Sequence, residues 1–173
     1  MPRDGTLPRR STPAQGLTRL AQVDPQTLAA AQTIFREYAA SLSVDLGFQG
    51  FDEEVDSLPG EYTTPRGALL LITVDDAMAG CCGIRPIDSA VYANACEMKR
   101  LYVRPAFRGL GLGRQLVEAA LENARIAAYD CVLLDTLDDM ESARALYAEL
   151  GFHEIPPYYE NPVVGAHYLK VDL

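Results

Sequence analysis

A turn rich in glycine is the part of the sequence best suited to chemistry. It reads Arg-Gly-Leu-Gly-Leu-Gly-Arg over residues 108–114, after an apolar run that ends at Val103 and before a helical pattern. Glycine lets a ligand approach the main chain closely. The free N–H groups and dipole of a first helical turn attract anions, and Arg108 and Arg114 add positive charge. The segment predicts a cradle for a phosphate or diphosphate group, with a tight loop that binds nothing as the alternative.

Two other classes of phosphate site fit this turn poorly. A P-loop ends in Gly-Lys-Ser/Thr, whereas this turn ends in Gly113-Arg114-Gln115. A dinucleotide fingerprint needs GxGxxG in a βαβ unit, and here the glycines alternate at positions 109, 111 and 113. The spacing therefore favours a different kind of anion site.

The elements that must position this turn form an α+β pattern. Apolar residues recurring at three and four predict helices over residues 24–42, 51–58, 111–128 and 138–150. Apolar runs predict strands over residues 67–74, 78–84, 95–103, 131–135, 152–155 and 166–171. We expect the first two strands to form an antiparallel hairpin around Asp75-Asp76. We expect Asp24-Pro25 to start the first helix and Asp138-x-x-Glu141 to act as a capping box. Together these elements predict one domain with a mixed sheet.

Two motifs in the right order resemble the Gcn5-related N-acetyltransferase (GNAT) family. Arg108-x-x-Gly111-x-Gly113 matches the family's R/Q-x-x-G-x-G/A signature. About 35 residues later, the run from Ala143 to Phe152 is similar to its A-x-x-L-Y-x-x-x-G-F motif. With the element order, the resemblance covers roughly residues 17–173. It implies a mostly antiparallel mixed sheet with a splayed central strand pair, flanked by helices, and acetyl-CoA as the co-substrate.

The resemblance also implies roles for individual residues. The strand end at Tyr102 and Val103 would bind the pantetheine arm, and Tyr147 would be the general acid. Glu97 matches a position where some members place a general base. The backbone of the glycine turn would hold the CoA diphosphate, and its residues are Arg108, Gly109, Leu110, Gly111, Leu112, Gly113 and Arg114. Many members have an asparagine seven residues before the tyrosine; here that position is Met140, which removes one polar contact with CoA.

The acid is chemically easier to explain than the base. A phenol near pKa ~10 protonating a thiolate near ~8.5 is uphill by roughly 2 kcal/mol. A glutamate near ~4.3 is a weak base for an ammonium near ~10.4, unless burial raises its pKa or it acts through water. Glu97 is therefore the first candidate base and Asp135 the reserve. Both residues also have a non-catalytic interpretation, in which Tyr147 is an ordinary core residue and Glu97 a solvated strand residue. Lys99 and Arg100 are expected on a charged strand surface.

Tyrosines beside carboxylates mark where an amine acceptor could bind. They occur in residues 58–62 and in the loop over residues 157–162, and the segment Pro65-Arg66-Gly67 is a further candidate for the acceptor site. A small cation could be received there by charge and cation–π contact, although such residues can equally pack the loops. The sequence predicts a primary amine of a small molecule or peptide and does not identify it.

The composition limits which partners, metal sites and cellular location we expect for the protein. A net charge of −9 and a pI near 4.6 argue against nucleic acid or an acidic membrane as a partner. Four cysteines lack CxxC spacing, so we expect buried thiols and no metal site. No apolar run reaches a membrane span and no secretory signal is recognised, which predicts a cytoplasmic protein. Residues 1–16 are expected to be a loose tail, residues 17–173 the domain, and a homodimer follows by analogy with relatives.

Two other functions remain open at this point. A non-catalytic acyl-CoA-binding or regulatory module would keep the glycine turn and lose the acid, so the presence of Tyr147 favours an enzyme. A transferase for a longer acyl group would differ in the size of residues near the split between the strands, which the sequence does not show.

Overall fold

Apolar runs separated by short polar turns form one mixed sheet in the computed structural model, which describes Gly16 and residues 18–173. The seven strands lie in the order β1-β2-β3-β4-β5-β7-β6. All neighbours are antiparallel except β4 and β5, which are parallel. The strands are β1 (Thr18–Gln22), β2 (Ala68–Val74), β3 (Ala77–Ile87), β4 (Ala95–Val103), β5 (Cys131–Leu137), β6 (His153–Ile155) and β7 (Ala166–Asp172). The predicted fold class is confirmed.

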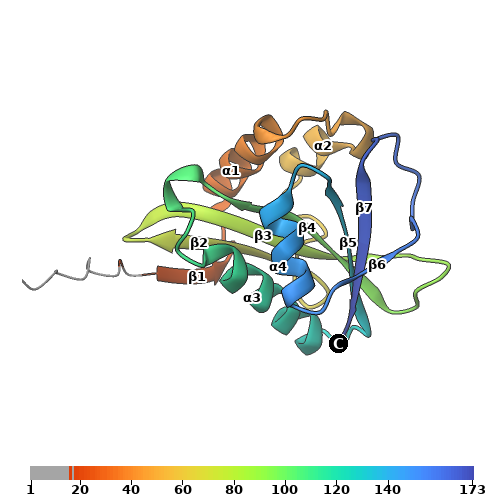
Figure 1. Ribbon diagram of the computed structural model, residues 1–173. Helices are drawn as coiled ribbons and strands as arrows, with labels where there is room; N and C mark the ends of the chain where they lie inside the picture. Colours follow the sequence, from red (N-terminus) through yellow and green to blue (C-terminus); the bar gives the residue numbers. More distant parts are fainter. Residues whose placement is uncertain (1–15, 17) are drawn as a thin grey trace, which may run out of the picture.

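Helices cover both faces of this sheet (Figure 1). One face packs against α3 and α4, because every third or fourth residue of α3 is apolar and buried. The other face packs against α1 and α2 through Leu69, Leu71 and Cys81. The helices are α1 (Leu28–Ser41), α2 (Phe51–Asp56), α3 (Leu112–Ile126) and α4 (Glu141–Glu149), with short 3₁₀ turns η1 (Gly47–Gln49) and η2 (Pro105–Phe107). The four cysteines are buried free thiols, as expected.

The parallel pair β4–β5 is joined along only part of its length. Pairing runs from Ala95 opposite Cys131 to Glu97 opposite Leu133 and then stops. Beyond that point β5 stays paired with β7 as far as Leu137, whereas β4 bulges. Between Lys99 and Tyr102, β4 has one residue more than β3 opposite it, and Arg100 has a φ of 61°. The expected splay is therefore present, and it leaves backbone groups of both strands free to bind a ligand.

Local predictions near the start of the chain were partly wrong. β1 was not expected, because a short, mostly exposed edge strand carries no apolar pattern and is held by backbone pairing with β2. Helix α1 begins at Leu28 rather than at Asp24, since the Asp24 carboxylate accepts N–H bonds from Gln26 and Thr27 in a turn before the helix. Apart from Gly16, the expected tail lies outside the described residues, so its boundary stays a prediction.

The capping box expected at Asp138 was also wrong. Helix α4 begins at Glu141 after Met140, which makes no side-chain capping bond. The Asp138 carboxylate contacts the His167 ring instead, because β7 passes beside the end of β5 and offers a closer partner. Within the described residues, no helix combines the length and apolar character needed to span a membrane.

Candidate active site

A groove of about 810 Å³ runs from the start of α3 across the open ends of the sheet to the end of α1. Of the residues predicted to bind CoA, those lining it are Tyr102, Val103, Arg108, Gly109, Gly111, Leu112 and Gly113. Leu110 is not among the lining residues and is largely exposed. Arg114 pairs with Glu118 and Glu149 instead. Most of the residues predicted to bind CoA therefore line one groove, whereas the side chains of Leu110 and Arg114 do not.

The glycine turn has the geometry of an anion cradle. Gly109 and Gly111 have φ of 82° and 75°, which L side chains rarely adopt, and a Cβ added at either would meet no atom within 4 Å. Open space therefore lies directly over the main chain. Helix α3 begins at Leu112, so its first N–H groups have no intrahelical acceptor. The helix dipole and these N–H groups fit a diphosphate lying on the turn.

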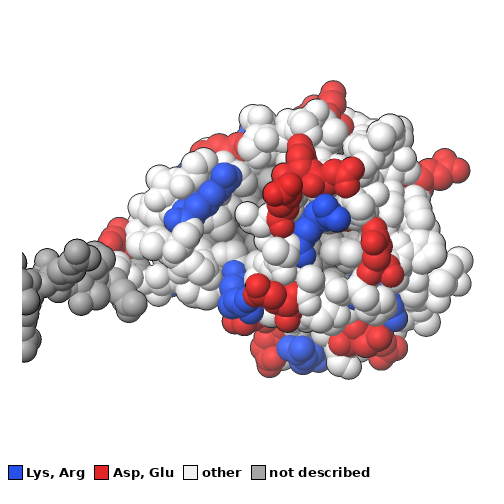
Figure 2. Space-filling model, viewed as in Figure 1, with Lys and Arg blue, Asp and Glu red and all other residues white. Residues whose placement is uncertain are grey.

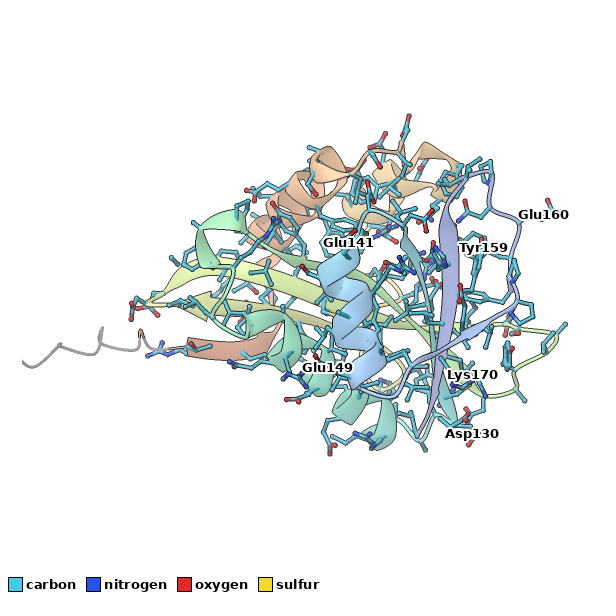
Figure 3. All side chains as sticks on the ribbon, in the orientation of Figure 1. Asp130, Glu141, Glu149, Tyr159, Glu160 and Lys170 are labelled. Atoms are coloured by element: carbon cyan, nitrogen blue, oxygen red, sulfur yellow. The ribbon has the colours of Figure 1, made fainter. Side chains whose placement is uncertain are left out.

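The opposite wall of the groove carries negative charge. Asp139 and Glu141 line it at the start of α4, and Figure 2 shows acidic side chains gathered over this end of the helix. Figure 3 marks the two ends of α4 by Glu141 and Glu149. Repulsion from these carboxylates favours placing an anionic ligand against the α3 turn.

A smaller inner cavity of about 50 Å³ lies between the open halves of β4 and β5. It shares Tyr38, Leu42, Leu101 and Met140 with the groove, so the two spaces adjoin. Its remaining walls come from β4, β5, α4, η1 and the loop between β6 and β7. A ligand stretched along the groove therefore ends beside a separate, partly enclosed space.

Tyr147 of α4 lines this inner cavity. The residue is 5% exposed, and its ring packs at 5.5 Å from that of Phe152. No residue in the described part of the chain hydrogen-bonds its hydroxyl. Burial raises the pKa of Tyr147 well above its usual value, which keeps the hydroxyl protonated. The structure thus presents a proton donor in the wall of the inner cavity.

Glu97 lies apart from the cavity, at the last paired position of β4. It is 2% exposed, and Arg85 donates to its Oε1 at 3.1 and 3.2 Å while the Tyr158 hydroxyl donates to Oε2 at 2.7 Å. Although burial acts to raise it, the Lys99 and Arg85 charges leave the pKa of Glu97 below its usual value. Both oxygens are engaged, which makes this carboxylate a poor proton acceptor.

Asp135, the reserve candidate, does line the cavity, from the open half of β5. The Tyr159 hydroxyl donates to its Oδ2 at 2.6 Å, and Lys99 Nζ is 3.9 Å from Oδ1. Figure 3 places Tyr159 beside β7, on the loop that returns from β6. Part of the loop over residues 157–162 thus reaches the cavity, because Asn161 lines it and Tyr159 bonds Asp135 in its wall.

The other two segments predicted to bind the acceptor lie elsewhere. Tyr62 is 3% exposed and donates to Glu54 in the core below α2. Arg66 stacks on the Tyr129 ring and donates to Ala127 O. Both segments are packing features, which sequence patterns cannot separate from a binding loop.

Lys99 and Arg100 are buried rather than on a charged strand surface, at 7% and 4% exposure. Arg100 binds both oxygens of Glu54 at 2.9 and 3.3 Å, and Lys99 faces the inner cavity. Sequence reasoning missed Lys99 and also Gln49, which reaches the cavity from η1. Alternation along β4, which puts Lys99 on the same face as Glu97, is the signal that could have found the lysine.

Comparison with known proteins agrees with this arrangement. Residues 31–152 match the Acetyltransferase (GNAT) family. An uncharacterised N-acetyltransferase of Schizosaccharomyces pombe is 35% identical over 150 residues, covering 86% of this chain and 90% of the relative. An acetyltransferase structure from Streptococcus agalactiae superposes with a TM-score of 0.73 at 18% identity, covering 90% of this chain and 98% of that one. A putative acetyltransferase from Salmonella typhimurium, solved with acetyl-CoA, gives 0.64 at 18% identity, covering 90% and 93%.

Proposed function

The chain belongs to the GNAT family of acetyltransferases, and we propose that it transfers the acetyl group of acetyl-CoA directly to a primary amine of a small molecule or peptide. The observation that carries this proposal is the inner cavity at the β4–β5 split, which adjoins the groove and is lined by Tyr147. A thioester at that junction meets a proton donor on one side and a space for an amine on the other.

The donor is held by main-chain groups more than by side chains. N–H groups of residues 108–114 bind the diphosphate, since open space lies over Gly109 and Gly111. The edge of β4 at Tyr102 and Val103 faces no strand on the β5 side and binds the pantetheine arm. Arg108 braces the turn by donating from Nε to Val103 O at 3.0 Å. Binding by main-chain N–H groups explains why the turn is rich in glycine rather than in charged residues.

Tyr147 acts as the general acid. Amine attack breaks the C–S bond, and the departing sulfur needs a proton. Burial raises the pKa of a thiol as it raises that of the phenol, so the two groups stay matched inside the cavity although both are displaced from their values in water. Because the Tyr147 hydroxyl has no partner in the described part of the chain, it is free to donate to the sulfur.

Asp135 is the better base of the two candidates. It lines the cavity, whereas Glu97 is outside it with both oxygens engaged. A carboxylate takes a proton from an ammonium only with help from a bound water or from simultaneous attack. We assign Asp135 to that role and leave Glu97 as a residue that orients Arg85 and Tyr158.

The test separates donor binding from turnover. Calorimetry measures acetyl-CoA binding to wild type and to Gly111→Glu, whose carboxylate and positive φ should abolish binding. A thiol-release assay then scans primary amines with wild type and Tyr147→Phe. The phenylalanine should leave acetyl-CoA binding unchanged and lower kcat by roughly 10²-fold or more.

Each result decides between stated alternatives. Failure of wild type to bind acetyl-CoA would contradict the proposal outright. Binding without turnover on any amine would favour a regulatory acyl-CoA-binding module instead. A homodimer and a cytoplasmic location, both expected from the sequence, stay predictions; sedimentation of the purified chain tests the first.

A further inference from the structure

The inner cavity contains one of the two lysines in the sequence, Lys99. Its side chain is 4% exposed, and its Nζ lies 3.5 Å from Glu97 Oε1 and 3.9 Å from Asp135 Oδ1. Both distances exceed the roughly 2.7–2.9 Å of a charge-assisted hydrogen bond. The ammonium is therefore attracted to two carboxylates without being tightly bonded to either, and it borders a space large enough for a ligand.

Glu97 and Asp135 are both engaged elsewhere. Glu97 is held by Arg85 and Tyr158, and Asp135 by Tyr159. Arg100, by contrast, has a bidentate bond to Glu54. Among the described residues, Lys99 is the one cation of this cluster with no hydrogen bond to a carboxylate, since Arg85 and Arg100 both donate to Glu54. Leaving an ammonium buried in that state is unfavourable, which suggests that an anionic ligand completes its surroundings.

A different group in the cavity has no hydrogen-bond partner at all. Gln49 Oε1 is the only buried side-chain nitrogen or oxygen among the described residues with no hydrogen-bond partner. The same amide donates from Nε2 to the Tyr159 hydroxyl at 3.2 Å. The unpaired oxygen borders the same cavity as Lys99.

The hydrogen-bond network fixes which way this amide points. The Tyr159 hydroxyl has one proton, which it donates to Asp135, so its other partners must be donors. Asn161 supplies one such donor at 3.0 Å, with its own oxygen held by Val163 N–H. Gln49 must supply the other, which leaves Oε1 as a true acceptor that requires an N–H from outside the protein.

The largely buried charges around the cavity balance. Glu54, Glu97 and Asp135 face Arg85, Lys99 and Arg100 in one connected cluster. The Glu61 carboxylate also lies 3.7 Å from Arg85, but it is 67% exposed and therefore screened by solvent. A ligand with a single net charge would leave this cluster unbalanced, whereas a zwitterion would preserve its neutrality. The inner cavity has about 50 Å³ against about 810 Å³ for the groove, so it suits the compact polar head of a small ligand.

We propose that the acetyl acceptor is an amino acid or a closely similar zwitterion, with its carboxylate bound by Lys99 Nζ and its amine N–H accepted by Gln49 Oε1. This inference rests on the proposed function. In the reaction, the ammonium loses a proton toward Asp135, the amine nitrogen bonds to the thioester carbon, and the C–S bond breaks. Tyr147 protonates the sulfur, so that the products are an N-acetyl amino acid, CoA thiol and one released proton.

Apolar walls define the side chain that this head carries. Val44, Leu46 and Phe48 line the cavity around Gln49. They suit an amino acid with an apolar side chain, such as leucine.

The experiment uses matched acceptors that differ only in the carboxylate. Leucine is compared with 3-methylbutylamine, which lacks the carboxylate, and with leucinamide, in which it is neutral. Each is assayed by thiol release with wild type, Lys99→Met and Lys170→Met. Lys170→Met removes the only other lysine, from the surface of β7 where it pairs with Asp172, and serves as the control.

We expect wild type to prefer leucine and Lys99→Met to raise the KM for leucine by roughly tenfold to a hundredfold, as for a lost charged hydrogen bond. The KM for 3-methylbutylamine should change less than about twofold, and Lys170→Met should behave as wild type. The ratio of the two acceptors between variants cancels their different amine pKa values. A lower kcat with unchanged KM would show that Lys99 is a base instead and would overturn the assignment.

Gln49→Leu gives an independent check, because it removes the unpaired oxygen with little change in volume. It should raise the KM for leucine and for 3-methylbutylamine alike. Calorimetry with acetyl-CoA on the same preparations separates the two levels of failure. Intact acetyl-CoA binding with equal use of all three acceptors would overturn this inference alone, whereas absence of acetyl-CoA binding would overturn the proposed function with it.

Discussion

The β4–β5 pair has a joined half and a split half, and the same kinds of charged residue have different surroundings in the two. In the joined half, Glu97 sits opposite Leu133 and has both carboxylate oxygens bonded within the protein. In the split half, Asp135 borders a cavity together with a loosely held Lys99 and the unbonded Tyr147 hydroxyl. Where the strands are paired, charged side chains hydrogen-bond to one another. Where the strands part, some donors and acceptors have no protein partner and can bind a ligand. The difference arises from strand pairing rather than from residue type.

Replacing the carboxylate of the split half is expected to have the largest effect. Asp135→Asn should lower kcat/KM by roughly 10²–10⁴-fold, because it removes the base and keeps an acceptor for the Tyr159 hydroxyl. Acetyl-CoA affinity and thermal midpoint should remain close to wild type. Thiol release and calorimetry measure both, with Asp130→Asn, an exposed site before β5, as the matched control. Retention of full activity would remove Asp135 from the mechanism.

The corresponding change in the joined half should affect folding instead. Glu97→Gln removes one carboxylate from both Arg85 and Lys99. We expect a loss of about 3 kcal/mol in unfolding free energy, the low end for breaking a buried pair, because Arg85 keeps Glu54 and Lys99 keeps Asp135. Denaturant unfolding measures this loss, and activity per folded molecule should fall only slightly. A loss of activity without a loss of stability would reverse the roles given to the two carboxylates.

The pH dependence sharpens this second prediction. The folded-state pKa of Glu97 is lowered from its ordinary value of 4.5. The contribution of this carboxylate to folding stability is therefore complete above pH 4.5. It is lost as the pH falls from 4.5 through the lower folded-state pKa. The stability difference between wild type and Glu97→Gln should therefore narrow in acid. A difference that stays constant down to the acid-unfolding range would contradict the ion-pair explanation.

The smallest effect is expected at the outer side of the split half, where His167 pairs with Thr136 of β5. Its ring contacts Glu154 and Asp138, and these carboxylates raise its pKa above 6.5. Its contribution to stability is therefore present below pH 6.5 and is lost as the pH rises through the raised folded-state value. For so exposed a group, we expect wild type to lose roughly 1–2 °C in thermal midpoint over that range, and His167→Gln to lose none of it. Parallel midpoints for the two proteins would show that the contacts are neutral.

Local patterns predicted most of the secondary structure because each element carries its own signal. The strand over residues 95–103 was predicted with the bounds that β4 has, and the long helix differs from α3 by one or two residues at its ends. The predictions failed where a distant partner competes for a local signal. Asp138 has the spacing of a capping residue, yet its carboxylate bonds His167, which is remote in the chain.

Positions in the active site show the same division. The glycine turn was recognisable from its letters, since the positive φ values at Gly109 and Gly111 and the N–H groups of a helix start are properties of the local chain. Glu97 was preferred over Asp135 by position in a motif, and the sequence contains no measure of which carboxylate is already bonded. Burial of Lys99 was likewise missed, because a lysine on a strand usually reaches solvent.

By itself, therefore, the sequence determined the α+β element order, the glycine turn at the start of α3 and the tyrosine motif of α4, because all three depend on residues close together along the chain. Only the tertiary structure decided which charged groups pair with one another and which remain available to a ligand. That choice depends on where β4 leaves β5 and on η1 and the β6–β7 loop, which bring Gln49 and Tyr159 together from 110 positions apart. Hydrogen-bond satisfaction is a property of three-dimensional neighbours, and no spacing in the sequence encodes it.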